Sequence, residues 1–563
     1  MSSRAAEQTA EALESIGQHQ DSEGAEYRIL GPPGCGKTTN TARQVRRAVE
    51  KYGENSVLVT SFSRTAAAEL AGRELPIPPS QVGTLHSHCY RALGHPEIAE
   101  SRVEEWNAAN PSMVITQQGK AERMDDGGDD GTGSRDGDHL LEEMSRLRGL
   151  MMERDFWPPA VRHFASKWED YKSANGLLDF TDLIEVCLRD TSMAPGAPSV
   201  LFADEAQDLT RMMAALVRRW GQWARHYVVV GDDDQCIFGF TGADPDVLID
   251  PPIPERNIIV LKQSYRVSVA VHAEAVRWIK AVRRRQEKEY FPRPFPGKVE
   301  RLAVGTWENP GDPVLRLLEK HLNEGQSVMF LASCTYQLRP LIKMLRDRGW
   351  PFQNPYRRSN GAWNPIRVGK AGTAANRILA LLAAHPDMGP DQRRWTRQDV
   401  AAWADWLKAE GIMKRGKKKS LHNGDMHQLV TEQDLDDIFT VSALDELLAS
   451  FEGDRGALLD WWLRRLDSAA HARCEFPVAV AKRHGPEALT EPPRIIVGTI
   501  HSVKGGEADV VVMWPDLSVA GALEYGRAGS SRDSVIRQFY VGMTRAREVL
   551  YIGQRATSQA VII

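Results

Sequence analysis

The chain has 563 residues and a formal net charge of −4; 42% of its residues are hydrophobic, 26% are charged and 7% are aromatic. This composition is typical of globular proteins, and it excludes a chain disordered throughout, a collagen-like fibre and a coiled-coil rod. The length predicts several domains. The near-neutral charge excludes a uniformly basic protein but is compatible with a locally basic groove.

The six cysteines are widely spaced and form no C-x-x-C pair, which argues against a disulfide framework and a cysteine-rich zinc site. The N-terminal residues lack the apolar stretch of a signal peptide, and the apolar runs are too short to cross a membrane. The sequence therefore predicts a soluble, cytoplasmic protein without membrane contact.

Short apolar runs alternate with helical patterns along the chain, which is typical of parallel sheets covered by helices. Strands are expected at 27–30, 57–60, 200–203, 227–230 and 258–261, and then at 328–332, 495–497, 510–513 and 549–552. A helix is expected from Thr39 to about Lys51. The two sets of strands predict an α/β fold with two cores, and the Pro-rich segment 291–297 is expected to be a hinge between them.

Each core is expected to be interrupted by a mainly helical insertion. The expected boundaries are 1–94 and 171–284 for core 1, 95–170 for its insertion, 285–365 and 488–563 for core 2, and 366–487 for its insertion. The Asp- and Gly-rich segment 124–138 is expected to be a disordered loop. The expected core of the second insertion consists of Trp403, Trp406, Leu407, Leu444, Leu447, Leu448, Trp461, Trp462 and Leu463.

Residues 31–38 read GPPGCGKT, between an expected strand and an expected helix, which is the G-x-x-x-x-G-K-T pattern of a phosphate-binding loop. Its backbone N–H groups would surround a phosphate at a helix N-terminus. Lys37 would reach the β- and γ-phosphates and Thr38 would bind Mg²⁺. The expected nucleotide-binding residues of this segment are Gly31, Pro32, Pro33, Gly34, Cys35, Gly36, Lys37, Thr38 and Thr39.

Two further segments place polar residues after expected strands. In VLFADEAQD at 200–208, Asp204 would hold Mg²⁺, and Glu205 would orient and deprotonate the attacking water. In VVVGDDDQCIFGFTGA at 228–243, Gln235 could sense the γ-phosphate. Phe238 and Phe240 could stack on bases or belong to the core.

With these motifs, the sequence resembles the superfamily 1 DNA helicases of the UvrD/Rep/PcrA type. The resemblance continues through an ordered series of segments along nearly the whole chain. They are VLVTSFSRTAAAEL at 57–70, VGTLHSHC at 82–89, LDFTDL at 178–183, LKQSYR at 261–266, GTIHSVKGGE at 498–507 and RQFYVGMTRA at 537–546. The resemblance implies two RecA-like P-loop NTPase cores and an enzyme, a DNA-stimulated, ATP-dependent DNA helicase.

The resemblance also implies roles for individual residues. Tyr265 would stack on adenine, Glu507 would bind the ribose, and Arg266 and Arg545 would reach the γ-phosphate. The implied catalytic residues are Lys37, Glu205, Gln235, Arg266 and Arg545. The implied path of single-stranded DNA is lined by Phe62, Thr84, His86, Phe240, Thr499 and His501.

The sequence departs from the family in three places that bear on the site. Phe240 and Thr241 stand where the family usually has Trp-Arg, and Thr39 stands where an Arg commonly follows the P-loop Thr. Gly506 replaces a Leu. The family's adenine-reading glutamine would be one of Gln8, Gln18 and Gln20.

The resemblance implies 3′→5′ movement on single-stranded DNA and unwinding of duplex in DNA repair, replication or recombination, with ATP and Mg²⁺ as cofactors. Single-stranded DNA, its junctions with duplex, and repair or replication proteins are the expected partners. Two alternatives stay open: a translocase that strips proteins from DNA with little unwinding, and a non-motor, nucleotide-gated DNA-binding protein. The basic run 414–419 is expected either to contact duplex DNA or to be a solvated loop.

Overall fold

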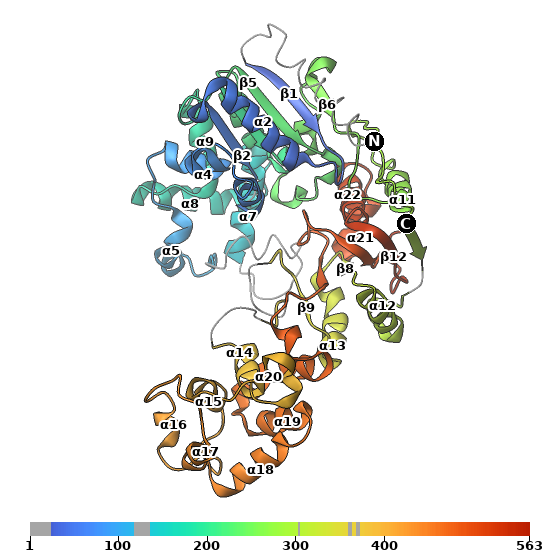
Figure 1. Cartoon of the computed structure of the whole chain (residues 1–563). Helices are drawn as coiled ribbons and strands as arrows, with labels where there is room; N and C mark the ends of the chain where they lie inside the picture. Colours follow the sequence, from blue (N-terminus) through green and yellow to red (C-terminus); the bar gives the residue numbers. More distant parts are fainter. Residues whose placement is uncertain (1–23, 63, 117–135, 302–303, 358–362, 367–371) are drawn as a thin grey trace. The chain divides into compact units, whose positions relative to one another are not determined.

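The computed structural model describes residues 24–62, 64–116, 136–301, 304–357, 363–366 and 372–563 (Figure 1). Its strands form two six-stranded sheets in which neighbouring strands pair in parallel, and helices cover them. The expected α/β fold with two helix-covered parallel sheets, the arrangement of two RecA-like cores, is thereby confirmed.

The first sheet has the strand order β3-β2-β4-β5-β1-β6. Its strands are β1 (Ala25–Leu30), β2 (Val57–Ser61), β3 (Val82–Thr84), β4 (Val200–Asp204), β5 (His226–Gly231) and β6 (Ile258–Val260). The second sheet has the order β7-β12-β11-β8-β10-β9. Its strands are β7 (Lys298–Arg301), β8 (Val328–Ala332), β9 (Phe352–Gln353), β10 (Ile495–Thr499), β11 (Ala508–Met513) and β12 (Ala546–Ile552).

Contacts within the chain define two compact units. The first unit is Met1–Arg301 with Ile500–Ile552 and Thr557–Ile563, and the second is Leu302–Thr499 with Gly553–Ala556. The α-helices of the first unit are α2 (Lys37–Tyr52), α3 (Arg64–Ala71), α4 (Leu85–Ala92), α5 (Val103–Ala109), α7 (Asp136–Gly149), α8 (Pro159–Asn175), α9 (Phe180–Asp190), α10 (Arg211–Gly221), α11 (Val269–Ile279), α21 (Val519–Gly526) and α22 (Ser530–Met543). Those of the second unit are α12 (Gly311–Asn323), α13 (Arg339–Asp347), α14 (Ala374–Leu382), α15 (Arg397–Ala404), α16 (Lys417–Ser420), α17 (Glu432–Ile438), α18 (Val441–Phe451), α19 (Arg455–Arg465) and α20 (Ser468–His484).

The first sheet is buried on both faces, which explains why its strands read as continuous apolar runs. Side chains alternate between the faces along each strand. Leu201 and Val229 contribute to a core with α4, α9 and α10, whereas Phe202 and Val228 contribute to a core with α2. Because the strands are parallel, their carboxyl ends meet at one edge of the sheet, where ligands bind in folds of this class.

Several expectations about single elements need correction. The short strands β3, β7 and β9 were not expected from the sequence. Residues 136–138 were expected to belong to the acidic loop, but they form the first turn of α7, where carboxylates are favoured by the helix dipole. Asp138 is buried and accepts hydrogen bonds from the backbone N–H (2.9 Å) and the hydroxyl (2.8 Å) of Thr116. The rest of that loop up to residue 135 lies outside the described residues.

The Pro-rich segment 291–297 makes specific backbone contacts with the segment that precedes α11. Ser264 N–H donates to Phe291 O at 2.8 Å, and Arg293 N–H donates to Val267 O at 2.8 Å. These bonds lie within the first unit. The segment 291–297, which was expected to be a hinge, is therefore hydrogen-bonded to residues 264–267, between β6 and α11.

The second unit contains the helices α14 to α20 (Figure 1). Of its expected core residues, Trp403, Leu407, Leu447, Trp461 and Trp462 are buried. Trp406, Leu444 and Leu463 are partly buried. Leu448 was expected in the core but is 41% exposed, because on α18 it is rotated by about 100° from the buried Leu447.

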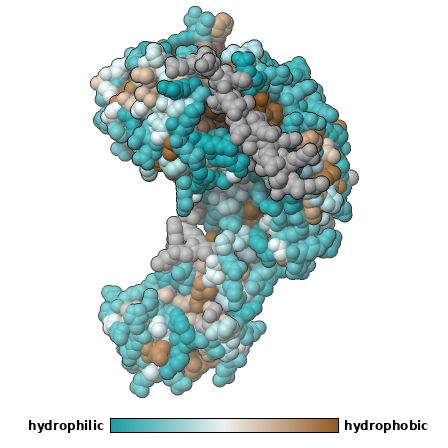
Figure 2. Space-filling model, turned by 45° about the horizontal axis from the view of Figure 1, so that its top comes forward, coloured by the Kyte–Doolittle hydropathy of each residue, from teal (hydrophilic) through white to brown (hydrophobic). Residues whose placement is uncertain are grey.

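No helix among the described residues is both long and apolar enough to span a membrane. On the face seen in Figure 2, hydrophobic side chains are scattered among hydrophilic ones. Scattered apolar side chains are normal on protein surfaces.

Candidate nucleotide site and aromatic platform

The segment 31–38 connects the carboxyl end of β1 to α2, as expected for a phosphate-binding loop. Gly31 requires the absence of a side chain, because an added Cβ would lie 2.1 Å from Cγ of Lys37. The Lys37 side chain folds back over the loop, and its Nζ donates to Gly31 O at 2.9 Å. The lysine is therefore held above the loop, where it can reach a bound phosphate.

The loop continues into the N-terminus of α2. Gly36, the N-cap residue, has a left-handed backbone conformation (φ 74°), and no side chain caps the helix. The first N–H groups of a helix have no partner within the helix and carry a partial positive charge. This arrangement suits a phosphate anion.

The loop packs closely against the segment before α11. An added Cβ at Gly34, whose φ is 72°, would lie 2.4 Å from Cβ of Arg266. Ser264 Oγ donates to Pro33 O at 2.8 Å, and Tyr265 N–H donates to Gly34 O at 2.9 Å. These contacts place Tyr265 and Arg266 beside the phosphate-binding loop, as the resemblance implies.

Asp204 and Glu205 lie at the carboxyl end of β4. Asp204 is buried, and Glu205 has the left-handed conformation (φ 52°) that non-glycine residues seldom adopt and that clusters at functional sites. Gln207 Nε2 donates a hydrogen bond to Glu205 Oε2.

Burial alone would raise the pKa of Glu205, but three cations, Lys37, Lys504 and Arg545, and the bond from Gln207 lower it below its ordinary value. A carboxylate that stays ionised at neutral pH can act as a base.

Gln235 and Arg545 contact each other directly. Arg545 Nη2 donates to Gln235 Oε1 at 3.3 Å, and its Nη1 donates to Gly506 O at 3.1 Å. Arg545 is only 1% exposed. Gln207 binds Glu205 and the Asp232 N–H, and Asp232 binds Gln235, so a series of hydrogen bonds connects Arg545 to the expected base.

Tyr265, Arg266 and Glu507 form the second side of the site. Arg266 Nε and Arg547 Nη1 both donate to Glu507, the latter at 2.7 Å. Burial raises the pKa of Glu507, yet the two arginines outweigh it and hold that pKa below its usual value. Tyr265 is 64% exposed, so its ring is available for stacking.

This set of residues fits a nucleoside triphosphate with Mg²⁺. The loop and the N-terminus of α2 offer N–H groups to phosphate, and Lys37, Arg266 and Arg545 supply cations. Thr38 and Asp204 offer the hydroxyl and carboxylate oxygens that Mg²⁺ prefers. Cys35 is buried, and burial raises the pKa of its thiol to about 12, so its place in the loop is structural.

The structure adds residues that the sequence reasoning did not single out. Gln207 links Glu205 to the Asp232 backbone, whose N–H donates to Gln207 Oε1 at 3.0 Å. Arg73 Nη1 donates to Thr39 Oγ1 at 3.0 Å, so a cation lies beside the position where the family has its Arg. Lys504 binds both carboxylate oxygens of Asp208 at 2.6 Å.

Except for the bond between Gln207 and Glu205, these contacts join residues at least 25 positions apart in the sequence. Gln207 and Lys504 do lie inside the quoted motifs, which is the one signal that could have identified them. The candidates Gln8, Gln18 and Gln20 lie outside the described residues.

Four aromatic rings form a continuous cluster in the first unit, called here the aromatic platform: Phe62, Phe238, Phe240 and His501. Phe62 stacks on Phe238 with centroids 6.1 Å apart, and Phe240 meets His501 edge-on at 5.5 Å. Lys504 Nζ lies 4.8 Å from the centre of the Phe238 ring. Phe240 is 42% exposed, which a stacking surface requires.

His501 is held as a neutral ring. Its Nε2 lies 3.1 Å from Ile237 O, and Gln538 Nε2 lies 3.4 Å from its Nδ1. Burial lowers the pKa of His501 to about 4. It therefore contributes an aromatic surface rather than a charge at neutral pH.

The other expected DNA-path residues differ in their surroundings. Thr84 is the N-cap of α4, and its Oγ1 accepts a hydrogen bond from Ser87 N–H at 3.2 Å. His86, in the first turn of α4, meets Phe180 edge-on. Thr499 is fully buried at the end of β10 in the second unit, where its side chain offers no surface to a ligand.

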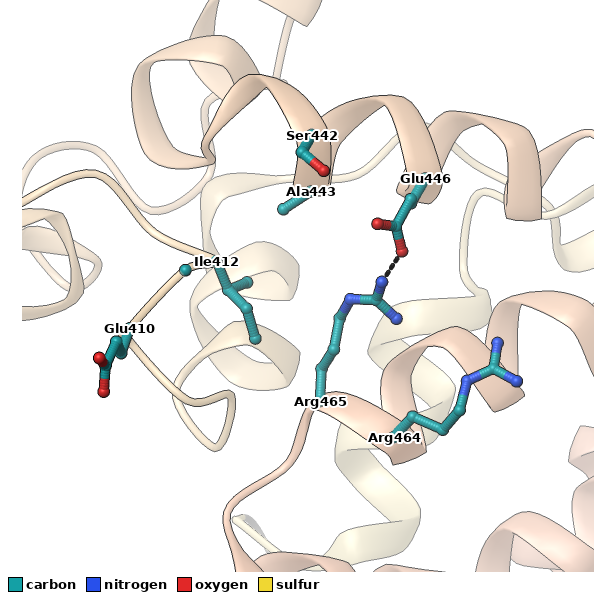
Figure 3. A pocket seen from close by; sticks show the side chains of 8 residues that line it. Glu410, Ile412, Ser442, Ala443, Glu446, Arg464 and Arg465 are labelled. Atoms are coloured by element: carbon teal, nitrogen blue, oxygen red, sulfur yellow. Dashed lines mark ion pairs between the residues drawn. The ribbon is translucent and has the colours of Figure 1, made fainter.

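A separate pocket lies in the second unit, between residues 410–412, α18 and α19 (Figure 3). Ile412 and Ala443 line it, and Arg465 forms an ion pair with Glu446 at its wall. None of the expected nucleotide- or DNA-binding residues lines this pocket.

The known proteins similar to this chain include ATP-dependent DNA helicases. Residues 16–241 match the family model described as "AAA domain". Over 359 residues the chain is 24% identical to "ATP-dependent DNA helicase PcrA" of Staphylococcus aureus, which covers 58% of this chain and 48% of the relative. Over 289 residues it is 24% identical to "Putative ATP-dependent DNA helicase YjcD" of Bacillus subtilis, covering 46% of this chain and 37% of the relative. The matched region thus spans about half the length of these relatives or less.

Proposed function

The chain is a homologue of the PcrA- and UvrD-type ATP-dependent DNA helicases of superfamily 1, and from this premise we propose that it is itself an ATP-dependent DNA helicase. It moves 3′→5′ along single-stranded DNA and unwinds duplex during DNA repair, replication or recombination. The observation that carries the proposal is the series of hydrogen bonds that connects Glu205, Gln235 and Arg545 in the first unit, beside the loop that Lys37 binds. A site that only binds nucleotide could lack the base or the arginine.

The residues of the site have different roles in ATP hydrolysis. Lys37 and the N-terminus of α2 bind the phosphates, and Thr38 and Asp204 hold Mg²⁺, which would neutralise phosphate charge when bound. Glu205 takes the proton of the attacking water. Arg266 and Arg545 stabilise the charge that develops on the γ-phosphate.

The aromatic platform supports grip on single-stranded DNA. Bases can stack on its rings without regard to sequence, as a motor requires. Lys504 joins the platform to the nucleotide site, since it lies over Phe238 and binds Asp208, three residues after Glu205. In this chain Lys504 supplies a positive charge between platform and nucleotide, whereas Thr241 is uncharged and bonds to Phe238 O at 2.8 Å.

The stripping translocase remains the second candidate, and Thr241 favours it. Without the family's Arg at this position, DNA binding and hydrolysis are linked through fewer charges. Comparing displacement of a DNA-bound protein with unwinding of a duplex on the same DNA separates the two activities. A non-motor binding protein is disfavoured by the complete hydrolytic set.

An ATPase assay with and without single-stranded DNA tests the proposal. Hydrolysis that needs Mg²⁺ and rises several-fold with single-stranded DNA is expected. A folded protein that binds nucleotide but shows no hydrolysis with either single-stranded or duplex DNA would support the non-motor alternative instead.

Phe240→Ala is expected to weaken single-strand binding. Base–aromatic stacking contributes about 1–3 kcal/mol per base, and the half-exposed ring contributes part of that, so affinity should fall by roughly 3- to 30-fold. Fluorescence anisotropy with a labelled oligonucleotide measures this change. Phe156→Ala, which removes an exposed ring of the first insertion, is the matched control and should bind as the native protein does. Unchanged affinity of Phe240→Ala would place Phe240 outside the DNA path.

Neutralising three cations of the basic run is expected to weaken duplex binding more than ATP hydrolysis. Lys418 Nζ donates to Leu407 O at 2.6 Å and Lys414 pairs with Asp436, so both are better left intact. The triple Gln variant of Arg415, Lys417 and Lys419 removes up to three phosphate contacts. The slope of log affinity against log salt should then fall by about 2–3.

The matched control is the triple Gln variant of Arg316, Lys320 and Lys343, three exposed cations of α12 and α13. Equal duplex affinity of the two variants at low salt would show that the run 414–419 is an ordinary solvated segment.

A further inference from the structure

Three consecutive aspartates after β5, Asp232, Asp233 and Asp234, are buried with their carboxylate oxygens close together. Such a group could hold a metal ion, but a lysine takes that place. Lys288 Nζ lies 3.0 Å from Asp232 and 3.1 Å from Asp234, bonds to Asp233 as well, and its side chain is 1% exposed. Arg285 Nε also donates to Asp234, at 2.9 Å.

Burial of the three carboxylates requires a neighbouring cation, and Lys288 supplies it. Three like charges out of water repel one another and are costly without cations. Burial and the neighbouring aspartates raise the pKa of Asp233 to about 6 despite the opposing effect of Lys288. The same three carboxylates hold the pKa of Lys288 above its ordinary value against the effect of burial, so the ammonium stays charged.

From Asp232, hydrogen bonds continue to Gln235 and Arg545, the two residues that we assign to the γ-phosphate. Lys288 contacts Asp232 Oδ1, and Asp232 Oδ2 accepts a hydrogen bond from Gln235 Nε2 at 2.6 Å. An amide has one NH₂ group and one oxygen, so binding its NH₂ to Asp232 turns Oε1 the other way. There Gln235 Oε1 accepts the bond from Arg545.

The segment that carries Lys288 also contacts the helix that leads to Arg545. Tyr290 OH lies 3.2 Å from Tyr540 OH, and Arg537 Nη2 donates to Arg284 O at 2.8 Å. Tyr540 and Arg537 belong to α22, which ends at Met543, two residues before Arg545. Residues 284–290 therefore contact both Asp232, which binds Gln235, and α22, which precedes Arg545.

We propose that Lys288 is a positioning residue for ATP hydrolysis: its ammonium fixes Asp232, and through Asp232 it sets the orientation of the Gln235 amide towards Arg545. The inference rests on the proposed function, because Gln235 and Arg545 act on the γ-phosphate there. Lys288 acts through its contacts with the three aspartates, so it is a positioning residue rather than a catalytic one.

Lys288→Met tests the proposal, because it keeps an unbranched side chain of nearly the same length and removes its charge. Gln235 and Arg545 act mainly in the transition state, so we expect kcat for ATP with saturating single-stranded DNA to fall by about 10- to 100-fold, with KM changed less than about 3-fold. Lys288→Arg should retain more of the rate. A native kcat in Lys288→Met would overturn the proposal.

The same substitution made in a Gln235→Ala protein separates a positioning role of Lys288 from a general structural role. If Lys288 acts through Gln235, then Lys288→Met should lower kcat by less than about 3-fold when Gln235 is already alanine. An undiminished loss on that background would overturn the proposal. The native protein is assayed beside these variants: lack of ATPase in the native protein itself would refute the proposed function, not this path.

Burial of three carboxylates without Lys288 could unfold the variant, so the double variant Lys288→Met with Asp233→Asn is included. It removes one negative charge, and the Asn amide oxygen can still accept the Gln286 N–H bond that Asp233 accepts at 2.9 Å. This double variant is expected to fold and to show the same loss of kcat. Asp233→Asn alone is the matched control. Asp233 contacts Lys288, whereas the Gln235 amide is bound by Asp232. The kcat of the Asp233→Asn protein should therefore stay near the native value. A native kcat in the folded double variant would overturn the proposal.

Discussion

Lys37→Ala is expected to abolish ATP hydrolysis and DNA unwinding while the protein stays folded. The lysine is half-buried, and its Nζ donates to Gly31 O, a hydrogen bond whose net contribution to stability is only about 0.5–1.5 kcal/mol. Its positive charge, in contrast, would contact the transferred phosphate directly. We expect kcat/KM for ATP to fall by at least roughly 10³-fold.

A coupled ATPase assay measures the effect, and a thermal melt verifies folding. Lys51→Ala, at the exposed end of the same helix, is the matched control and should hydrolyse ATP at the native rate. Near-native hydrolysis by a folded Lys37→Ala protein would remove the nucleotide site from segment 31–38.

Glu205→Gln is expected to separate binding from turnover. The glutamine keeps the shape of the side chain and leaves Asp204 and Thr38 in place, so nucleotide should still bind. Without the carboxylate no base takes the proton of water, and turnover should fall by roughly 10²–10⁴-fold. Because the pKa of Glu205 is held below its ordinary value, the native carboxylate is ionised throughout the usual assay range.

Nucleotide affinity and single-turnover hydrolysis test this separation. Glu54→Gln replaces an exposed carboxylate just beyond α2 and serves as the control. Unchanged single-turnover hydrolysis in Glu205→Gln would show that another group is the base.

The central strands could be predicted because burial on both faces leaves a continuous apolar run. Val200–Asp204 and Val328–Ala332 were found in this way. The strands that were not predicted from the sequence are β3, β7 and β9. They have two to four residues and lie at the edges of the sheets. So short a run has no distinct period, and its pairing is decided by tertiary contacts.

The sequence proposed the site residues from two sources, the glycine pattern and carboxylates beside expected strands, and the resemblance to a known family. It could not show their supporting contacts. Lys288 is an ordinary lysine in the sequence, and only the fold brings it to Asp232, 56 positions earlier in the chain. Arg73 is likewise unremarkable until it reaches Thr39.

The acidic segment shows the limit of composition as a guide. Asp136 and Asp138 share the composition of the preceding residues but begin a helix, because the first turn of a helix favours carboxylates and Thr116 offers Asp138 two donors. Composition describes the average of a segment, whereas a helix start depends on single contacts.

The proposal that this chain is a 3′→5′ DNA motor is tested most directly by unwinding of two partial duplexes that differ only in the polarity of their single-stranded tail. Strand separation is followed by fluorescence with ATP and Mg²⁺, and the Glu205→Gln protein serves as the inactive control. We expect the 3′-tailed duplex to be separated in an ATP-dependent manner and the 5′-tailed duplex to remain paired. Separation of the 5′-tailed duplex alone, or equal separation by Glu205→Gln, would contradict the account.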